Sequence, residues 1–350
     1  MCGLRPELLL PMTTLTSPHD LLAAIPFLIG YHPTDSLVIV SLKEDCVGMA
    51  MRVDYPSIDA VGSADAFDAL VFHLVREGSE GALVVAYVPD DRNDGAEILE
   101  GISVALTRAE IPIRESLLIA HGRWRSVLCT DQECCPVQGN ELPEISTSRV
   151  AVEQVADGRP MPYGNREGMA ESIAPLSLAS DATFVSQVEQ SRIDTEGDHL
   201  QMDQRVGALA VLDLASRFIA GSLGRDIADD QRLSAQVLGS LCDIQVRDFA
   251  LGSHDETTIE IYWTMWRYLI RIAPAGFVSP VASLLAALSY EKGEGAFAQR
   301  CLDRALADDP SYSLAALLRR VFSAGWPPQS FGAMRRDLHP KVCAGIFDTQ

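Results

Sequence analysis

The pattern of apolar and polar positions predicts an α/β region in the first part of the chain. Five apolar runs are typical of strands, and they lie at 36–42, 47–53, 82–88, 116–120 and 124–129. Two segments with apolar residues at helical spacing separate them, at 65–75 and 98–106. The predicted order is therefore strand, strand, helix, strand, helix, strand, strand (ββαβαββ) in an α/β domain with a mixed sheet over residues 14–140.

The connections predict the strand directions. A strand, helix, strand unit favours parallel pairing, whereas a short polar turn favours an antiparallel hairpin. We therefore expect a parallel middle of the sheet with an antiparallel hairpin at each end.

A helix is expected before the first strand. Ser17 is placed as an N-cap, Pro18 suits the first helical position and Asp20 suits the first turn. Pro26 lacks a backbone N–H, so we expect the helix to stop or kink there. Gly30 is then free to take a left-handed conformation.

The second half of the chain predicts an all-α domain at 201–347. Its helix candidates are 206–220, 230–241, 258–272, 281–290, 296–307 and 313–324. Residues 279–312 fit the spacing of one tetratricopeptide-like unit, and a helical bundle that uses the same hairpin is the alternative. Residues 141–200 are expected to form a connector with short helices.

Three motifs carry a resemblance to a known family. The first is S-P-x-D-L-L-A-x-x-P-x-L-x-G-Y-x-P-x-x-S-L-V at 17–38, and the others lie at 123–136 and 303–315. With these motifs the chain resembles an uncharacterised actinobacterial family defined by a domain of unknown function. The resemblance implies kinship and supplies no catalytic residues.

Charge and composition indicate which classes of partner to expect. The chain has 28 basic and 48 acidic residues, a formal net charge of −20 that repels nucleic acid and anionic membrane surfaces. No apolar run has the length of a signal peptide or a membrane span. We therefore expect a cytoplasmic protein with reduced cysteines and neither nucleic acid nor membrane as partner.

Polar residues gather where the predicted strands end. Ligands of open α/β sheets collect at the carboxyl ends of strands, and an antiparallel first strand would begin at that same edge. The candidate catalytic residues there are His32, Asp35, Asp90, Asp91, Asp94, His121 and Arg123. The aspartates could hold a divalent cation, with His121 as a base and Arg123 facing an anion. The alternative is that Asp94 caps the next helix and the others form a solvated loop.

The cysteines at 129, 134 and 135 resemble part of a metal site. Cys129, Cys134 and Cys135 could share a zinc ion through their thiolates. Four ligands are usual, so Cys46, His121 or Cys343 would have to complete the set. The alternatives are a redox or structural thiol pair and a loop without chemistry.

Common catalytic motifs are absent from the chain. It has no phosphate loop, no dinucleotide-binding glycine motif, no H-E-x-x-H and no nucleophile elbow, so no cofactor is evident beyond zinc or another divalent cation. Our first hypothesis is a cytoplasmic protein that binds a ligand, or a partner protein through its helical domain. The second is a metal-assisted hydrolase at the carboxyl edge of the sheet.

Overall fold

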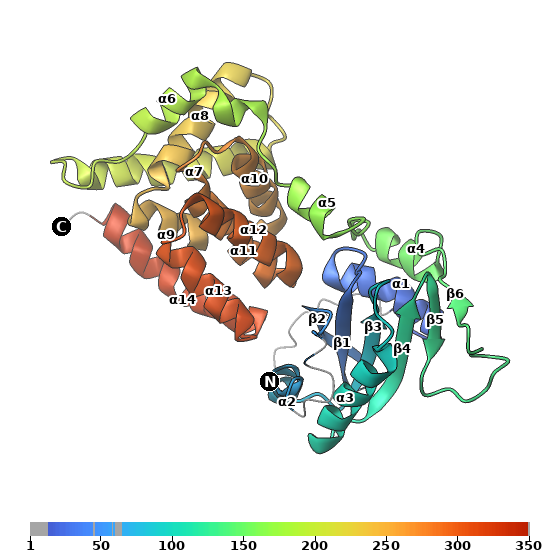
Figure 1. The fold of residues 1–350 in the computed structure, drawn as a ribbon. Helices are drawn as coiled ribbons and strands as arrows, with labels where there is room; N and C mark the ends of the chain where they lie inside the picture. Colours follow the sequence, from blue (N-terminus) through green and yellow to red (C-terminus); the bar gives the residue numbers. More distant parts are fainter. Residues whose placement is uncertain (1–12, 45, 58, 60–64, 349–350) are drawn as a thin grey trace, which may run out of the picture. The chain divides into compact units, whose positions relative to one another are not determined.

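The chain forms two compact units, residues 1–168 and 169–350 (Figure 1). The computed structural model describes residues 13–44, 46–57, 59 and 65–348. Within these residues, the first unit holds one mixed sheet with helices and the second is helical. The predicted fold class, an α/β region followed by an all-α region, is confirmed.

The described strands of the first unit form one sheet in the order β2-β1-β3-β4-β5-β6. They are β1 (Ser36–Lys43), β2 (Cys46–Asp54), β3 (Gly81–Tyr87), β4 (Ile113–Ala120), β5 (Arg123–Ser126) and β6 (Asn140–Glu141). The helices are α1 (Pro18–Ile29), α2 (Asp68–Glu77), α3 (Gly95–Arg108), α4 (Arg149–Ala156) and α5 (Arg166–Glu171), and α5 crosses into the second unit.

The middle of the sheet differs from the prediction. Strand β1 lies between β2 and β3 and is antiparallel to both, so β3 and β4 form the parallel pair among the described strands. The expected hairpins, β1 with β2 and β4 with β5, are present. The crossover through α2 passes over β1, because β1 occupies the position beside β3.

The structure also defines two element ends. Helix α1 continues through Pro26 to Ile29, and Gly30 ends it in the expected left-handed conformation, with φ 87° and an N–H that donates to the Pro26 carbonyl. Strand β5 ends at Ser126 because its hydroxyl accepts the backbone N–H groups of Leu128 and Cys129 and turns the chain out of the sheet. The turn before β5 has positive φ at His121 and Gly122, as a tight hairpin requires.

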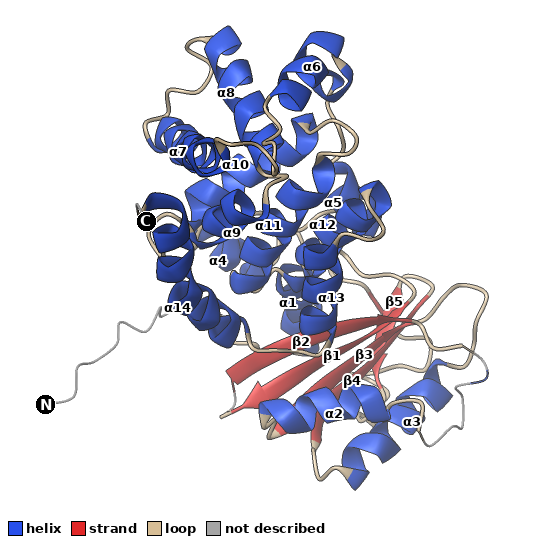
Figure 2. Ribbon diagram, turned by 90° about the vertical axis from the view of Figure 1, so that its left-hand side faces the viewer, coloured by secondary structure: helices blue, strands red, loops and turns tan. Residues whose placement is uncertain are grey.

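One face of the sheet is covered by α2 and α3, with α1 on the other face (Figure 2). Alternate residues of the strands point toward α2 and α3, including Leu37 and Ile39 of β1 and Val84 of β3, which are at most 1% exposed. They pack with Leu74 of α2 and Ile102 of α3 in one apolar core. This core fixes the register of the strands and the position of their ends.

The second unit contains every helix predicted for it. They are α7 (Leu200–Ile219), α8 (Ile227–Ser240), α10 (Ile259–Ile272), α11 (Val278–Glu291), α12 (Gly295–Asp308) and α13 (Ser313–Ser323). Three further α-helices among the described residues are α6 (Ala182–Gln190), α9 (Ile244–Gly252) and α14 (Pro328–Phe347), and a short 3-10 helix spans Ser177–Ser180. Helices α11 and α12 form one helical hairpin, and the tetratricopeptide-like repeat stays a prediction. No helix in the described residues is long and apolar enough to cross a bilayer.

A buried ion pair joins three helices of the second unit. Arg335 of α14 donates two hydrogen bonds of 3.0 Å to the carboxylate of Glu291 at the end of α11. It also donates to the carbonyls of Gly252, the last residue of α9, and of His254, at 3.2 and 3.1 Å. The Arg335 side chain is 3% exposed, so these partners have to replace the water that would otherwise stabilise its charge.

His254 completes this group, although the sequence indicated no partner for it. Its Nε2 lies 3.5 Å from Glu291 Oε2. Burial lowers the pKa of His254, so the imidazole is neutral at pH 7. Burial alone would raise the pKa of Glu291, but the neighbouring His254 imidazole and the hydrogen bonds and charge of Arg335 outweigh that effect and lower this pKa to about 2.

We predict that Glu291→Gln destabilises the helical unit by about 3 kcal/mol, because it leaves Arg335 buried without a counter-charge. Since the pKa of Glu291 is lower in the folded state, its contribution is complete above pH 4.5 and is lost as the pH falls toward about 2. The difference in free energy of unfolding between wild type and Glu291→Gln should therefore narrow as the pH falls over that range. Urea unfolding at several pH values measures this difference.

Glu260→Gln is the matched control. Glu260 pairs with Lys292 on the surface, where its side chain is 69% exposed, so the loss should stay below about 1 kcal/mol. The role assigned to Glu291 would be contradicted if the two variants lost equal stability, or if the stability difference between wild type and Glu291→Gln did not change with pH.

Candidate functional site

A pocket of about 440 Å³ lies at the edge of the sheet where β2 and β3 end and β1 begins. The register places Ser36 of β1 opposite both Asp54 of β2 and Tyr87 of β3, so three strand ends meet there. The pocket is lined by Tyr31, His32, Thr34, Asp35, Arg52, Asp54, Tyr55, Pro89, Asp91, Arg92, Arg166 and Glu167.

A backbone bridge brings a distant segment to this edge. Tyr31 pairs with Tyr163 in an isolated bridge, in which His32 donates its N–H to the Tyr163 carbonyl at 3.0 Å and Tyr163 donates to Gly30 at 2.9 Å. Helix α5 begins three residues later. Arg166 and Glu167, its first residues, thereby reach the pocket.

The arginines of the pocket differ in what already holds them. Arg52 pairs with Asp54 and donates to the Thr34 and Asp35 carbonyls. Arg92 pairs with Asp94 and lies over the Tyr55 ring. Arg166 has one longer contact among the described residues, 3.5 Å to Asp54, and its side chain is 39% exposed. Arg166 is therefore the guanidinium most available to a ligand.

Three carboxylates of the pocket, those of Asp35, Asp91 and Glu167, have no ion-pair partner among the described residues. His32 is half-buried beside them, and burial lowers its pKa, an effect that Glu144 partly opposes. The imidazole is therefore neutral at pH 7. It can accept or donate one hydrogen bond in that form.

Asp35 has an unusual backbone conformation, with φ 44°. Its carbonyl accepts the Tyr55 N–H at 2.9 Å and a bond from Arg52, and these bonds hold the turn before β1. Left-handed φ is unfavourable for residues with a Cβ, although Asp tolerates it better than most.

The structure separates the predicted catalytic residues into groups. His32, Asp35 and Asp91 line the pocket. Asp94 lies outside the lining, where it accepts a hydrogen bond from Tyr55 at 3.1 Å, and its pKa is lowered mainly by Arg92.

The other predicted residues lie away from the pocket lining. Asp90 and His121 are exposed and 3.3 Å apart. Arg123 donates to the Gly139 carbonyl at 2.7 Å. Sequence reasoning missed Arg52 and Arg166: the first precedes Asp54 by two residues on β2 and so shares its face, whereas nothing local indicated the second.

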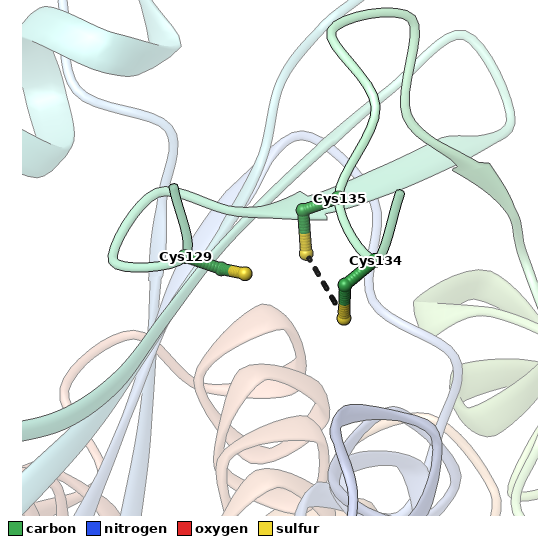
Figure 3. A group of neighbouring side chains, drawn as sticks. All are labelled: Cys129, Cys134 and Cys135. Carbon is green, nitrogen blue, oxygen red and sulfur yellow. Dashed lines mark hydrogen bonds between the residues drawn. The ribbon is translucent and has the colours of Figure 1, made fainter. Parts of the chain in front are cut away.

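The predicted metal-ligand cysteines do come together. The thiol sulfurs of Cys129, Cys134 and Cys135 all lie within 4.8 Å of one another, in the loop between β5 and β6 (Figure 3). Hydrogen bonding and charge repulsion from Cys135 and Cys129 raise the pKa of Cys134 to about 11. Cys343, a predicted fourth ligand, lies in the second unit, 3.4 Å from His339.

The chain belongs to the family described as "Domain of unknown function (DUF4192)", whose model matches residues 18–329. No curated protein and no solved structure matches it. The description of the family names no activity.

We predict that Asp35→Ala lowers the stability of the first unit by up to about 1 kcal/mol, because the left-handed conformation costs an ordinary residue about 1–2 kcal/mol and Asp bears part of that cost already. Asp35→Gly should be more stable than Asp35→Ala, because glycine adopts this φ freely. Thermal unfolding measures both variants. At Asp90, which has no positive φ, the Ala variant should instead be more stable than the Gly variant. If the Gly variant is the more stable one at both positions, the result argues against strain at Asp35.

Proposed function

We propose that the chain is a ligand-binding protein whose pocket at the sheet edge takes a small polar molecule. One observation carries the proposal: Arg166 shares the pocket with the carboxylates of Asp35, Asp91 and Glu167, which have no ion-pair partner among the described residues. Such a lining complements a ligand that has an acidic group and also ammonium or hydroxyl donors.

The neutral imidazole of His32 supports this class of ligand. It offers a hydrogen bond without adding charge, and the Arg52 and Arg92 pairs keep the walls of the pocket in place. A cytoplasmic setting is part of the proposal, since none of the seven described cysteines forms a disulfide, as expected in a reducing compartment.

The helical unit offers a second candidate function, the binding of a partner protein. Helix α7 exposes Met202, Val206 and Leu209, each 44–58% accessible, and their spacing places them on one face. Such a face fits an apolar helix of a partner. We rank it second because the stripe comes from one helix, whereas the pocket gathers side chains from four segments of the chain.

The ligand proposal predicts a specific loss in Arg166→Ala. In a thermal-shift screen of free amino acids and sugar acids, at least one compound should raise the unfolding temperature of wild type. Arg166→Ala should weaken its binding about tenfold or more, because a hydrogen bond to a charged group contributes about 1.5–3 kcal/mol. Isothermal titration then gives the affinities.

Arg225→Ala is the control, because Arg225 is exposed and lies in the other unit. It should leave binding unchanged. The proposal fails if no compound of either class stabilises wild type, or if Arg166→Ala binds as tightly as Arg225→Ala.

A further inference from the structure

The three-cysteine loop has the dimensions of a metal site. Sulfurs that bind one Zn²⁺ at about 2.3 Å in tetrahedral geometry lie about 3.8 Å apart. Here the Cys134 and Cys135 sulfurs are 4.0 Å apart and no pair exceeds 4.8 Å. A contraction of less than about 1 Å would bring all three onto one ion. Figure 3 shows the three side chains turned toward a common space.

Hydrogen bonds hold the loop that carries these thiols. The Ser126 hydroxyl donates to Glu115 on β4 at 2.6 Å and accepts the Cys129 N–H at 3.2 Å, which ties Cys129 to the sheet. Farther on, the Cys135 N–H donates to the Asp131 carbonyl at 2.8 Å, and Asn140 on β6 donates to the Cys134 carbonyl at 2.9 Å. The donor set is therefore arranged before any ion binds.

The same distances exclude a disulfide in this state. A disulfide needs sulfurs about 2.05 Å apart, and the Cys134–Cys135 separation is 4.0 Å. Three converging thiols are unfavourable once deprotonated, because the thiolates repel one another. A bound cation removes that repulsion, and thiolates favour Zn²⁺ and other thiophilic ions over Mg²⁺ or Ca²⁺.

A cavity adjoins the loop on the side of α3. Its volume is about 470 Å³, and both Cys129 and Cys135 line it together with Glu100 and Ser103 of α3. Among the described residues, no fourth His, Cys, Asp or Glu joins the three thiols. A metal held there would keep one position for an outside ligand, as zinc sites with three protein ligands do.

We propose that Cys129, Cys134 and Cys135 bind one Zn²⁺ through their thiolates and leave its fourth position open to the cavity beside α3. The site would take water or a small anion there. It shares no residue with the pocket of Arg166, so its success or failure is separate from that of the ligand proposal.

The first test is metal analysis of the full chain purified under reducing conditions without chelators. We expect about one zinc per chain. The metal-free chain titrated with Co²⁺ should show sulfur-to-cobalt charge-transfer absorption and the intense visible bands of tetrahedral cobalt. Zn²⁺ should then displace them. A chain that holds no zinc and gives no such bands overturns the proposal.

Single Cys→Ser variants at 129, 134 and 135 should each weaken Zn²⁺ binding at least about 100-fold, more than the loss of a supporting residue around a metal causes. Cys46→Ser is the control, because Cys46, a predicted fourth ligand, is an exposed thiol of the same unit that does not join the three thiols among the described residues. Circular dichroism of the metal-free variants separates loss of the site from loss of the fold. Unchanged cobalt bands in the three variants overturn the proposal.

The open position has its own test. Azide or imidazole added to the Co²⁺ form should shift the visible bands, because each can occupy the free site. Bands that do not respond would show a closed site and overturn that part of the proposal.

Discussion

The first unit depends on one constraint, that β1 is hydrogen-bonded on both sides and runs antiparallel to both neighbours. A strand in that position has to begin where its neighbours end. The turn that carries Tyr31 to Asp35 is therefore held against Asp54 and the loop after β3, and the pocket results. The buried apolar residues of β1 secure this arrangement, because a shift of one residue would turn Leu37 and Ile39 away from the core.

The two candidate sites are held together by different interactions. The pocket at the sheet edge collects charged groups from distant segments, and most of its arginines are already neutralised by carboxylates. The cysteine loop is local, since its three thiols lie within seven residues and its shape comes from hydrogen bonds to Ser126, Asp131 and Asn140. A local site of this kind can be recognised from spacing, whereas the pocket requires the topology.

The strands and most helices could be predicted because their apolar periodicity is strong. The antiparallel hairpin of the first two strands also predicted that His32 and Asp35 lie at the sheet edge beside Asp54. It could not show that β1 separates β2 from β3. With strands about 4.8 Å apart, His121 after β4 lies about 14 Å across the sheet from β2, too far to join Asp54. Arg166 was not predictable either, because only the Tyr31–Tyr163 bridge brings it near.

The ion pair between Glu291 and Arg335 has a consequence for how the family is delimited. The family match ends at residue 329, one residue after α14 begins, so nearly all of this helix lies beyond it. A chain shortened to the matched length would lose Arg335 and leave the Glu291 carboxylate and the carbonyls of Gly252 and His254 without this donor. The folding unit is thus longer than the stretch that the family model matches, and expression of the helical region should extend through Phe347.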